Sequence, residues 1–129
     1  MSKPSVLIVE DEIFVAMDVE RVLEDAGFTV VGLAADRTEA LDRVDGARLA
    51  FVDVNLRDGA TGPTVACSLC DQHGAQVIYL TANPSQIIPV ASRAVGVLTK
   101  PFSEASLVAV ALAVAEGRSP GQVAGYTAY

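Results

Sequence analysis

The sequence predicts a three-layer α/β sandwich built around a five-stranded parallel sheet. Short apolar runs alternate with helical patterns in five strand–helix repeats along the 129 residues. Continuous apolar runs are typical of strands buried on both faces, as parallel strands are. Right-handed crossovers then place helices on both sides of the sheet. The length fits one domain whose core needs no disulfide or metal to support it.

The first two repeats are regular. An apolar strand at 5–9 precedes a helix at about 12–26, in which apolar residues recur at helical spacing. A strand at 28–33 then precedes a helix that begins at Asp36, a natural N-cap, and runs to Asp45.

The next two repeats differ in quality. A strand at 49–52 leads through a loop of turn residues to a helix at 63–73, which begins with a proline. A strand at 76–80 is followed by a helix at 84–92. Two prolines fall in this last segment, so we expect a short or distorted helix there.

The fifth repeat closes the domain, which we expect to span residues 1–118. A strand at 95–99 precedes a helix from Ser103, its N-cap, to Glu116, and residues 119–129 are predicted to be a flexible tail. The helix is apolar on nearly every face, whereas a surface helix normally has a polar stripe. Either its small alanines are simply exposed, or it contacts a second copy in a homodimer or another partner.

Composition excludes several classes of function. The net charge of −7 argues against nucleic acid or an anionic membrane surface as a direct partner. No apolar run approaches the roughly 18 residues of a membrane span. The first residues lack the apolar core of a secretory signal, so we expect a cytoplasmic protein.

Chemically useful side chains stand where the predicted strands end. These are Glu10 and Asp11, Asp53, Thr81 and Lys100. Parallel strands end along one edge of their sheet, where ligands bind in such folds. Three carboxylates, a hydroxyl and an ammonium are the groups needed to bind Mg²⁺ and to accept a phosphoryl group.

Each of these residues has a role that suits its chemistry. Mg²⁺ takes one or two carboxylates from protein, here Asp11 and Asp53, with the Asn55 backbone carbonyl as a further ligand and Glu10 holding a coordinated water. Asp53 is central and is the candidate nucleophile, because carboxylates form aspartyl-phosphate intermediates.

The transferred oxygens need neutralising partners as well. The Lys100 ammonium would contact one, and the Thr81 hydroxyl with the Ala82 amide another. Taken singly, the acids could be turn formers and Thr81 a cap. Only two lysines occur, Lys3 and Lys100. A lysine at a strand end is therefore less easily explained as an exposed residue that only aids solubility.

The chain resembles the receiver domain of two-component response regulators over essentially its whole length. The resemblance rests on four segments in this order: VLIVEDE (6–12), FVDVNL (51–56), IYLTA (78–82) and TKPF (99–102).

This resemblance implies a flavodoxin-like topology and a phosphoprotein of a phosphorelay. A sensor histidine kinase or histidine phosphotransfer protein would phosphorylate Asp53. The Mg²⁺ acids would be Glu10 and Asp11, and the phosphoryl contacts Thr81 and Lys100. A receiver catalyses its own phosphorylation and slow dephosphorylation and is not an enzyme acting on a separate substrate. The Lys100–Pro101 bond is expected to be cis.

The chain also departs from the family pattern. Its first acid is Glu10, where Asp is commoner, and Asn55-Leu56 replaces the usual Met-Pro. Val97 stands where receivers carry an aromatic switch, so the usual coupling of threonine to an aromatic residue is not expected in its standard form. Tyr79 is a candidate substitute.

Exposed apolar residues around the pocket predict a docking surface for the phosphodonor. We place Ile13, Phe14 and Met17 in it from the first helix, with Pro101 and Phe102 from the loop after the last strand. The alternative is ordinary core packing of the two phenylalanines.

Cys67 and Cys70 form a C-x-x-C inside a predicted helix, with His73 at the same spacing. A redox or metal site is one interpretation, but a redox pair stands at a helix start and no fourth ligand is evident. Helix packing is the simpler interpretation.

Three functions compete. The leading hypothesis is a stand-alone phosphoacceptor that signals by protein contact or drains phosphoryl groups from a kinase. The second is an adaptor that keeps the fold without being phosphorylated. The third, a phosphatase with an aspartyl intermediate, ranks last because Asp53-Val54-Asn55 lacks the second acid of Asp-x-Asp.

Overall fold

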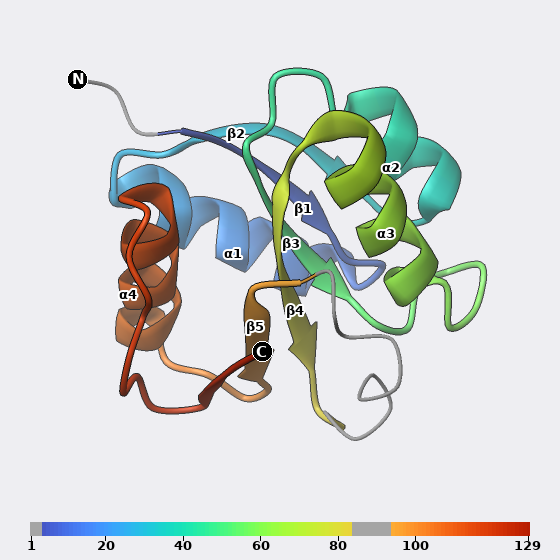
Figure 1. Ribbon diagram of the computed structural model, residues 1–129. Helices are drawn as coiled ribbons and strands as arrows, with labels where there is room; N and C mark the ends of the chain where they lie inside the picture. Colours follow the sequence, from blue (N-terminus) through green and yellow to red (C-terminus); the bar gives the residue numbers. More distant parts are fainter. Residues whose placement is uncertain (1–3, 84–93) are drawn as a thin grey trace.

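One mixed sheet organises the chain, with helices on both of its faces (Figure 1). The computed structural model describes residues 4–83 and 94–129. Its elements are β1 (Ser5–Val9), α1 (Ile13–Asp25), β2 (Thr29–Ala34), α2 (Arg37–Arg43), β3 (Leu49–Asp53), α3 (Gly62–His73), β4 (Gln76–Thr81), β5 (Gly96–Thr99), α4 (Glu104–Ala115) and β6 (Tyr126–Ala128). The strand order is β2-β1-β3-β4-β5-β6, and the first five strands are parallel. The predicted flavodoxin-like α/β fold is confirmed.

The central strands are buried on both faces, which explains their uninterrupted apolar sequence. Side chains alternate along a strand, so Ile8 and Phe51 pack with α1 and α4, whereas Leu7 and Val52 pack with α2 and α3. These two pairs of helices form the outer layers (Figure 1). Helices thus cover both faces of the sheet, and the functional side chains lie at one end of its strands.

Two predicted helix starts are confirmed. The Asp36 carboxylate accepts from the Glu39 amide at 2.9 Å, and the Glu39 carboxylate accepts in turn from the Ala35 amide at 2.8 Å. Ser103 accepts from the Ser106 amide at 3.0 Å and caps α4. These side chains satisfy amides that have no carbonyl partner inside their helices.

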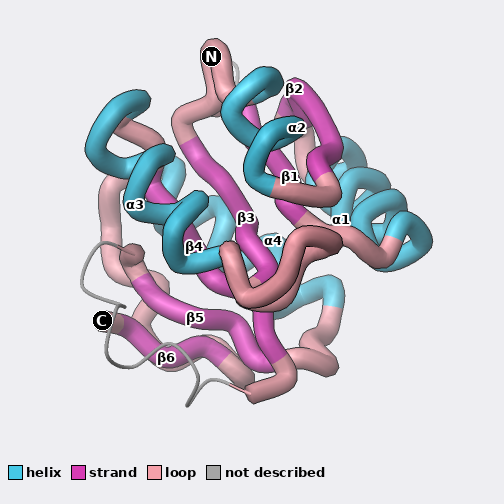
Figure 2. Tube along the Cα trace, turned by 90° about the vertical axis from the view of Figure 1, so that its right-hand side faces the viewer, coloured by secondary structure: helices cyan, strands magenta, loops and turns pink. Residues whose placement is uncertain are grey.

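Two expectations need comment. The predicted helix at 84–92 lies outside the described residues. The expected five-stranded sheet has a sixth strand, because β6 pairs antiparallel with β5 within the segment predicted to be a flexible tail (Figure 2). Its three residues carry no apolar run, and it is held by backbone pairing to the outer edge of β5.

The last helix, α4, keeps the apolar character that the sequence shows. Its buried residues pack into the core, and Val108, Ala109 and Leu112 border a groove with Val22 of α1 and with Ala26, the C-cap of α1. Within residues 4–83 and 94–129, none of the helices has both the length and the apolar character needed to cross a bilayer.

Candidate functional site

The predicted site residues meet in one pocket at the carboxyl ends of β1, β3, β4 and β5. Its volume is about 360 Å³. It is lined by Asp11, Glu12, Asp53, Asn55, Thr81, Ala82, Asn83 and Lys100. Glu10, whose side chain is buried, is not among the residues that line the pocket.

Three carboxylates form the acidic part of this site. Glu10, Asp11 and Asp53 each place an oxygen within 4.8 Å of the other two. Two of them are buried and Asp11 is exposed. This set offers hard oxygen ligands with one side open to water, which fits Mg²⁺. Within the described part of the chain, no other group of His, Cys, Asp or Glu side chains is clustered in this way.

Lys100 joins two of the acids. Its Nζ donates to Glu10 Oε1 at 2.6 Å and to Asp53 Oδ2 at 2.8 Å. Burial acts to lower the pKa of Lys100, but the hydrogen bonds to Asp53 and Glu10 outweigh it, so that the pKa lies above its usual value. The ammonium is therefore charged at every pH at which the protein would work.

Glu10 has an altered affinity for protons. Burial raises the pKa of Glu10 to about 7, and the hydrogen bond from Lys100 opposes this shift only in part. The carboxylate lies at the end of β1, where its own amide bonds to the Ala34 carbonyl of β2 and fixes the turn. A bound divalent cation would favour the ionised form.

Asp53 ends the central strand β3 and has both oxygens engaged. Oδ1 accepts from the Asn55 amide at 3.0 Å, and Oδ2 accepts from Lys100. Only 7% of the residue is exposed, yet it lines the pocket. A buried carboxylate with a fixed orientation is suited to act as a nucleophile toward a group entering from the pocket.

Thr81, Ala82 and Asn83 also line the pocket. The Thr81 hydroxyl accepts from the Asn83 amide at 3.0 Å, which orients its oxygen. The Thr81 carbonyl accepts from the Lys100 amide at 2.8 Å, so the ends of β4 and β5 are tied together. The Lys100–Pro101 peptide bond is cis, as expected.

Most of the predicted docking residues are on the surface. The exposed fractions of Ile13, Phe14 and Met17 are 54%, 83% and 51%, and Pro101 is also exposed. Core packing is therefore excluded for Phe14. Phe102, in contrast, does pack against the core and is half-buried.

Other predicted features are placed as follows. Cys67 and Cys70 lie on α3 and are partly buried, and Cys70 packs against the core, as the simpler interpretation expects. Val97 and Tyr79 are both buried and lie side by side in β5 and β4.

The pocket also contains Glu12, which the sequence prediction of site residues left out. Its amide donates to Glu10 Oε2 at 3.3 Å. Its place in the same acidic run as Glu10 and Asp11 was the signal for it.

Comparison with known proteins gives a consistent result. The family model described as "Response regulator receiver domain" matches residues 6–112. The phyllosphere-induced regulator PhyR of Methylorubrum extorquens is 33% identical over 81% of this chain and 41% of its own length. The transcriptional regulatory protein PdtaR of Mycobacterium tuberculosis is 33% identical over 88% of this chain and 58% of its own length. The chain thus spans roughly half the length of these curated relatives.

Solved structures agree. The receiver domain of Erythrobacter litoralis PhyR, studied by solution NMR, superposes with a TM-score of 0.81 at 28% identity. That match covers 96% of this chain and 98% of the other. The response regulator PhyR of Brucella abortus superposes with a TM-score of 0.76 at 29% identity, over 88% of this chain and 47% of its own.

Proposed function

Because this chain belongs to the response regulator receiver domain family, we propose that it accepts a phosphoryl group on Asp53 in a Mg²⁺-dependent reaction. The donor is a sensor histidine kinase or a histidine phosphotransfer protein. The observation that carries the proposal is the Asp53 carboxylate, which is fixed by the Asn55 amide and Lys100 at the floor of an open acidic pocket.

The residues divide the work of phosphoryl transfer. An Asp53 oxygen attacks phosphorus and forms an O–P bond as the N–P bond to the donor histidine breaks, and the leaving imidazole takes up a proton. Lys100 moves from the carboxylates to the incoming phosphoryl oxygens, and the Thr81 hydroxyl and Ala82 amide bond another oxygen. These contacts neutralise charge that builds up in the transition state.

Asp11, Asp53 and the Asn55 carbonyl would hold Mg²⁺, with Glu10 beneath them. When bound, the ion offsets the negative charge of the acids and of the phosphoryl group. The three clustered carboxylates fit this requirement, since Lys100 is their only cationic hydrogen-bond partner among the described residues.

The exposed residues Ile13, Phe14, Met17 and Pro101 form the surface on which the donor docks in this proposal. Ile13 and Pro101 directly follow the pocket residues Glu12 and Lys100, and a large exposed aromatic such as Phe14 is a typical anchor for a partner.

The groove between α4 and α1 suits either a second copy of the chain or a partner protein.

The experiment that tests the proposal is intact-mass measurement after incubation with Mg²⁺ and acetyl phosphate. One added phosphoryl group on the wild type, and none on Asp53→Ala, is the expected result. Asp58→Asn is the matched control, because Asp58 is an exposed acid in the loop after β3 and should leave the adduct unchanged.

The rate at which the adduct decays distinguishes a phosphate sink from a switch. Fast decay without a stable partner indicates a sink, and a complex that forms only after phosphorylation indicates a switch. If neither acetyl phosphate nor phosphohistidine donors modify a folded, Mg²⁺-binding protein, phosphotransfer is refuted and the unphosphorylated adaptor takes its place.

A further inference from the structure

The outer edge of β5 is covered by a strand from the far end of the sequence. β6 pairs antiparallel with it, with Leu98 opposite Tyr126 and Val97 opposite Thr127. The Thr99 amide donates to the Gly125 carbonyl at 2.9 Å, and the Tyr129 amide donates to the Val95 carbonyl at 3.0 Å. Bonded pairs alternate along an antiparallel ladder, so Val97 and Thr127, midway between these two, form a bonded pair as well.

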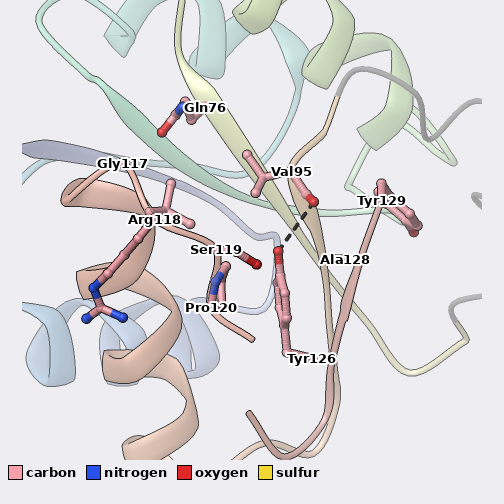
Figure 3. A pocket seen from close by; sticks show the side chains of 10 residues that line it. Gln76, Val95, Gly117, Arg118, Ser119, Pro120, Tyr126, Ala128 and Tyr129 are labelled. Atoms are coloured by element: carbon pink, nitrogen blue, oxygen red, sulfur yellow. Dashed lines mark hydrogen bonds between the residues drawn. The ribbon is translucent and has the colours of Figure 1, made fainter. Parts of the chain in front are cut away.

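Tyr126 anchors β6 at the position where β5 has a glycine, Gly96. Its hydroxyl donates to the Val95 carbonyl at 3.3 Å (Figure 3). The ring lies close to Gly96. A Cβ at Gly96 would come within 2.4 Å of the Tyr126 hydroxyl oxygen and 2.5 Å of the Thr127 carbonyl oxygen. The absence of a side chain at Gly96 therefore makes room for this aromatic residue and its strand.

The packing of the strand is incomplete. A cavity of about 290 Å³ lies between β6 and the turn at 117–120 that follows α4 (Figure 3). The Tyr129 ring meets the Tyr79 ring edge-on at 6.5 Å, but the buried Tyr79 hydroxyl has no hydrogen-bond partner among the described residues. Thr127, Ala128 and Tyr129 are exposed. Apart from Tyr126, which packs against the core, and the contact of Tyr129 with Tyr79, the strand is held by its backbone hydrogen bonds.

We propose that the β5 edge is a docking site for an extended polypeptide segment of a partner protein, and that Gly125–Tyr129 occupies it in cis until that segment replaces it. The present occupant defines the ligand chemistry. The segment runs antiparallel to β5, places an aromatic residue over Gly96, and places a second large residue three positions later against Tyr79. This inference goes beyond phosphoryl transfer and does not depend on it.

The cis strand has a concentration advantage over any partner. A tethered segment acts at an effective concentration in the millimolar range, so a free peptide cannot displace it at ordinary concentrations. The test therefore first weakens the cis strand. Thr127→Pro removes the amide that bonds to Val97, and Thr127→Val, which keeps the amide, is its matched control.

Hydrogen exchange of single amides provides the readout. The Thr99 amide bonds to the carbonyl of Gly125, directly before β6, whereas the neighbouring Lys100 amide bonds to the Thr81 carbonyl of β4. In Thr127→Pro we expect exchange of the Thr99 amide to become about tenfold faster, as expected for loss of one hydrogen bond of ordinary strength. Exchange of the Lys100 amide should not change, nor should either amide in Thr127→Val.

A synthetic peptide with the sequence of residues 123–129 is the probe for docking. At millimolar concentration it should restore protection of the Thr99 amide in Thr127→Pro, and the same peptide with proline at the Thr127 position should not. Unchanged exchange of Thr99 in Thr127→Pro, or no restoration by the peptide, overturns the proposal.

A second variant guards against a general opening of the sheet by proline. Tyr126→Ala removes the anchor and leaves every backbone amide in place, and it should also accelerate exchange of the Thr99 amide but not of Lys100. If it changes neither, the anchor role of Tyr126 and the proposal fail. No phosphodonor is present in these experiments, so their failure would leave phosphorylation of Asp53 untouched.

Discussion

Lys100 connects three strands of the sheet through one ammonium group. It extends from the end of β5 and bonds to Glu10 after β1 and to Asp53 on β3. The side chain of Glu10 is fully buried and that of Asp53 is 10% exposed. Two buried carboxylates left without their cation would be strongly destabilising.

We predict that Lys100→Met lowers the free energy of unfolding of the metal-free protein by about 2 kcal/mol near pH 8, since Lys100 is partly open to solvent. Urea unfolding in the presence of a chelator measures this. Arg21→Met is the control, because its ion pairs with Asp18 and Glu104 are on the surface and should contribute less. An equal loss in both variants would contradict the prediction.

The raised pKa of Glu10 has a consequence for stability. The unfolded chain releases this proton near pH 4.5, whereas the folded protein keeps it up to about pH 7. The associated stabilisation is fully present below pH 4.5 and is lost as the pH rises through 7. In the metal-free protein we expect a loss on the order of 2 kcal/mol between pH 5 and 8.

Glu10→Gln should flatten this part of the stability profile, because a glutamine does not ionise. Denaturant unfolding over a series of pH values, with a chelator present, compares the two proteins. The same slope in both would show that another group causes the pH dependence. Added Mg²⁺ should reduce the slope in the wild type by favouring the ionised carboxylate.

Sequence reasoning identified the residues of the pocket because their chemistry and their positions at strand ends point the same way. Glu10, Asp11, Asp53, Thr81 and Lys100 each follow an apolar run, and parallel strands align those ends. The pairing of Lys100 with both Glu10 and Asp53 was beyond sequence reasoning. It depends on strand spacing and burial, and these determine which oxygen lies nearest the ammonium.

At the scale of elements, the start of α3 controls the geometry after β3. The Gly62 amide donates to the Val54 carbonyl at 3.0 Å. A Cβ at Gly62 would lie 2.2 Å from the Asp53 carbonyl oxygen and 2.6 Å from Val54 Cα. The helix can therefore approach the end of β3 this closely only because residue 62 is a glycine.

Gly62→Ala should lower the free energy of unfolding by about 1–3 kcal/mol, the usual cost of an overpacked interior, and should slow phosphoryl acceptance. Slower acceptance follows because the displaced backbone carries Asp53 with it. Thermal unfolding and the rate of the mass increase with acetyl phosphate measure the two effects. Gly59→Ala serves as a loop control for phosphorylation, since nothing lies within 4 Å of its Cβ position, although its φ of +108° adds backbone strain.

Elements with a local signature were predictable from sequence, and β6 was not. The N-caps Asp36 and Ser103 mark the starts of their helices, because their side chains accept hydrogen bonds from amides three residues later. β6 has three residues and no apolar alternation of its own. Its stability comes from an edge formed by β5, distant in sequence, and propensity within a short window contains no information about that edge.

For the molecule as a whole, ion binding should stabilise the native state. A ligand that binds only the folded chain adds about 2.7 kcal/mol at a concentration one hundred times its dissociation constant. We therefore expect Mg²⁺ to raise the unfolding temperature relative to NaCl of equal ionic strength. Asp11→Asn should abolish most of the rise, and a full rise in that variant would place the ion elsewhere.

The pocket residues lie far apart in the sequence, so the site can form only late in synthesis of the chain. Both acids that contact Lys100 come from β1 and β3, and the lysine follows them by 90 and 47 positions. A nascent chain thus carries mutually repelling carboxylates long before their cation leaves the ribosome. In the proposed function, only the finished sheet is competent to accept a phosphoryl group, so incomplete chains would not compete with mature ones for the donor's phosphoryl groups.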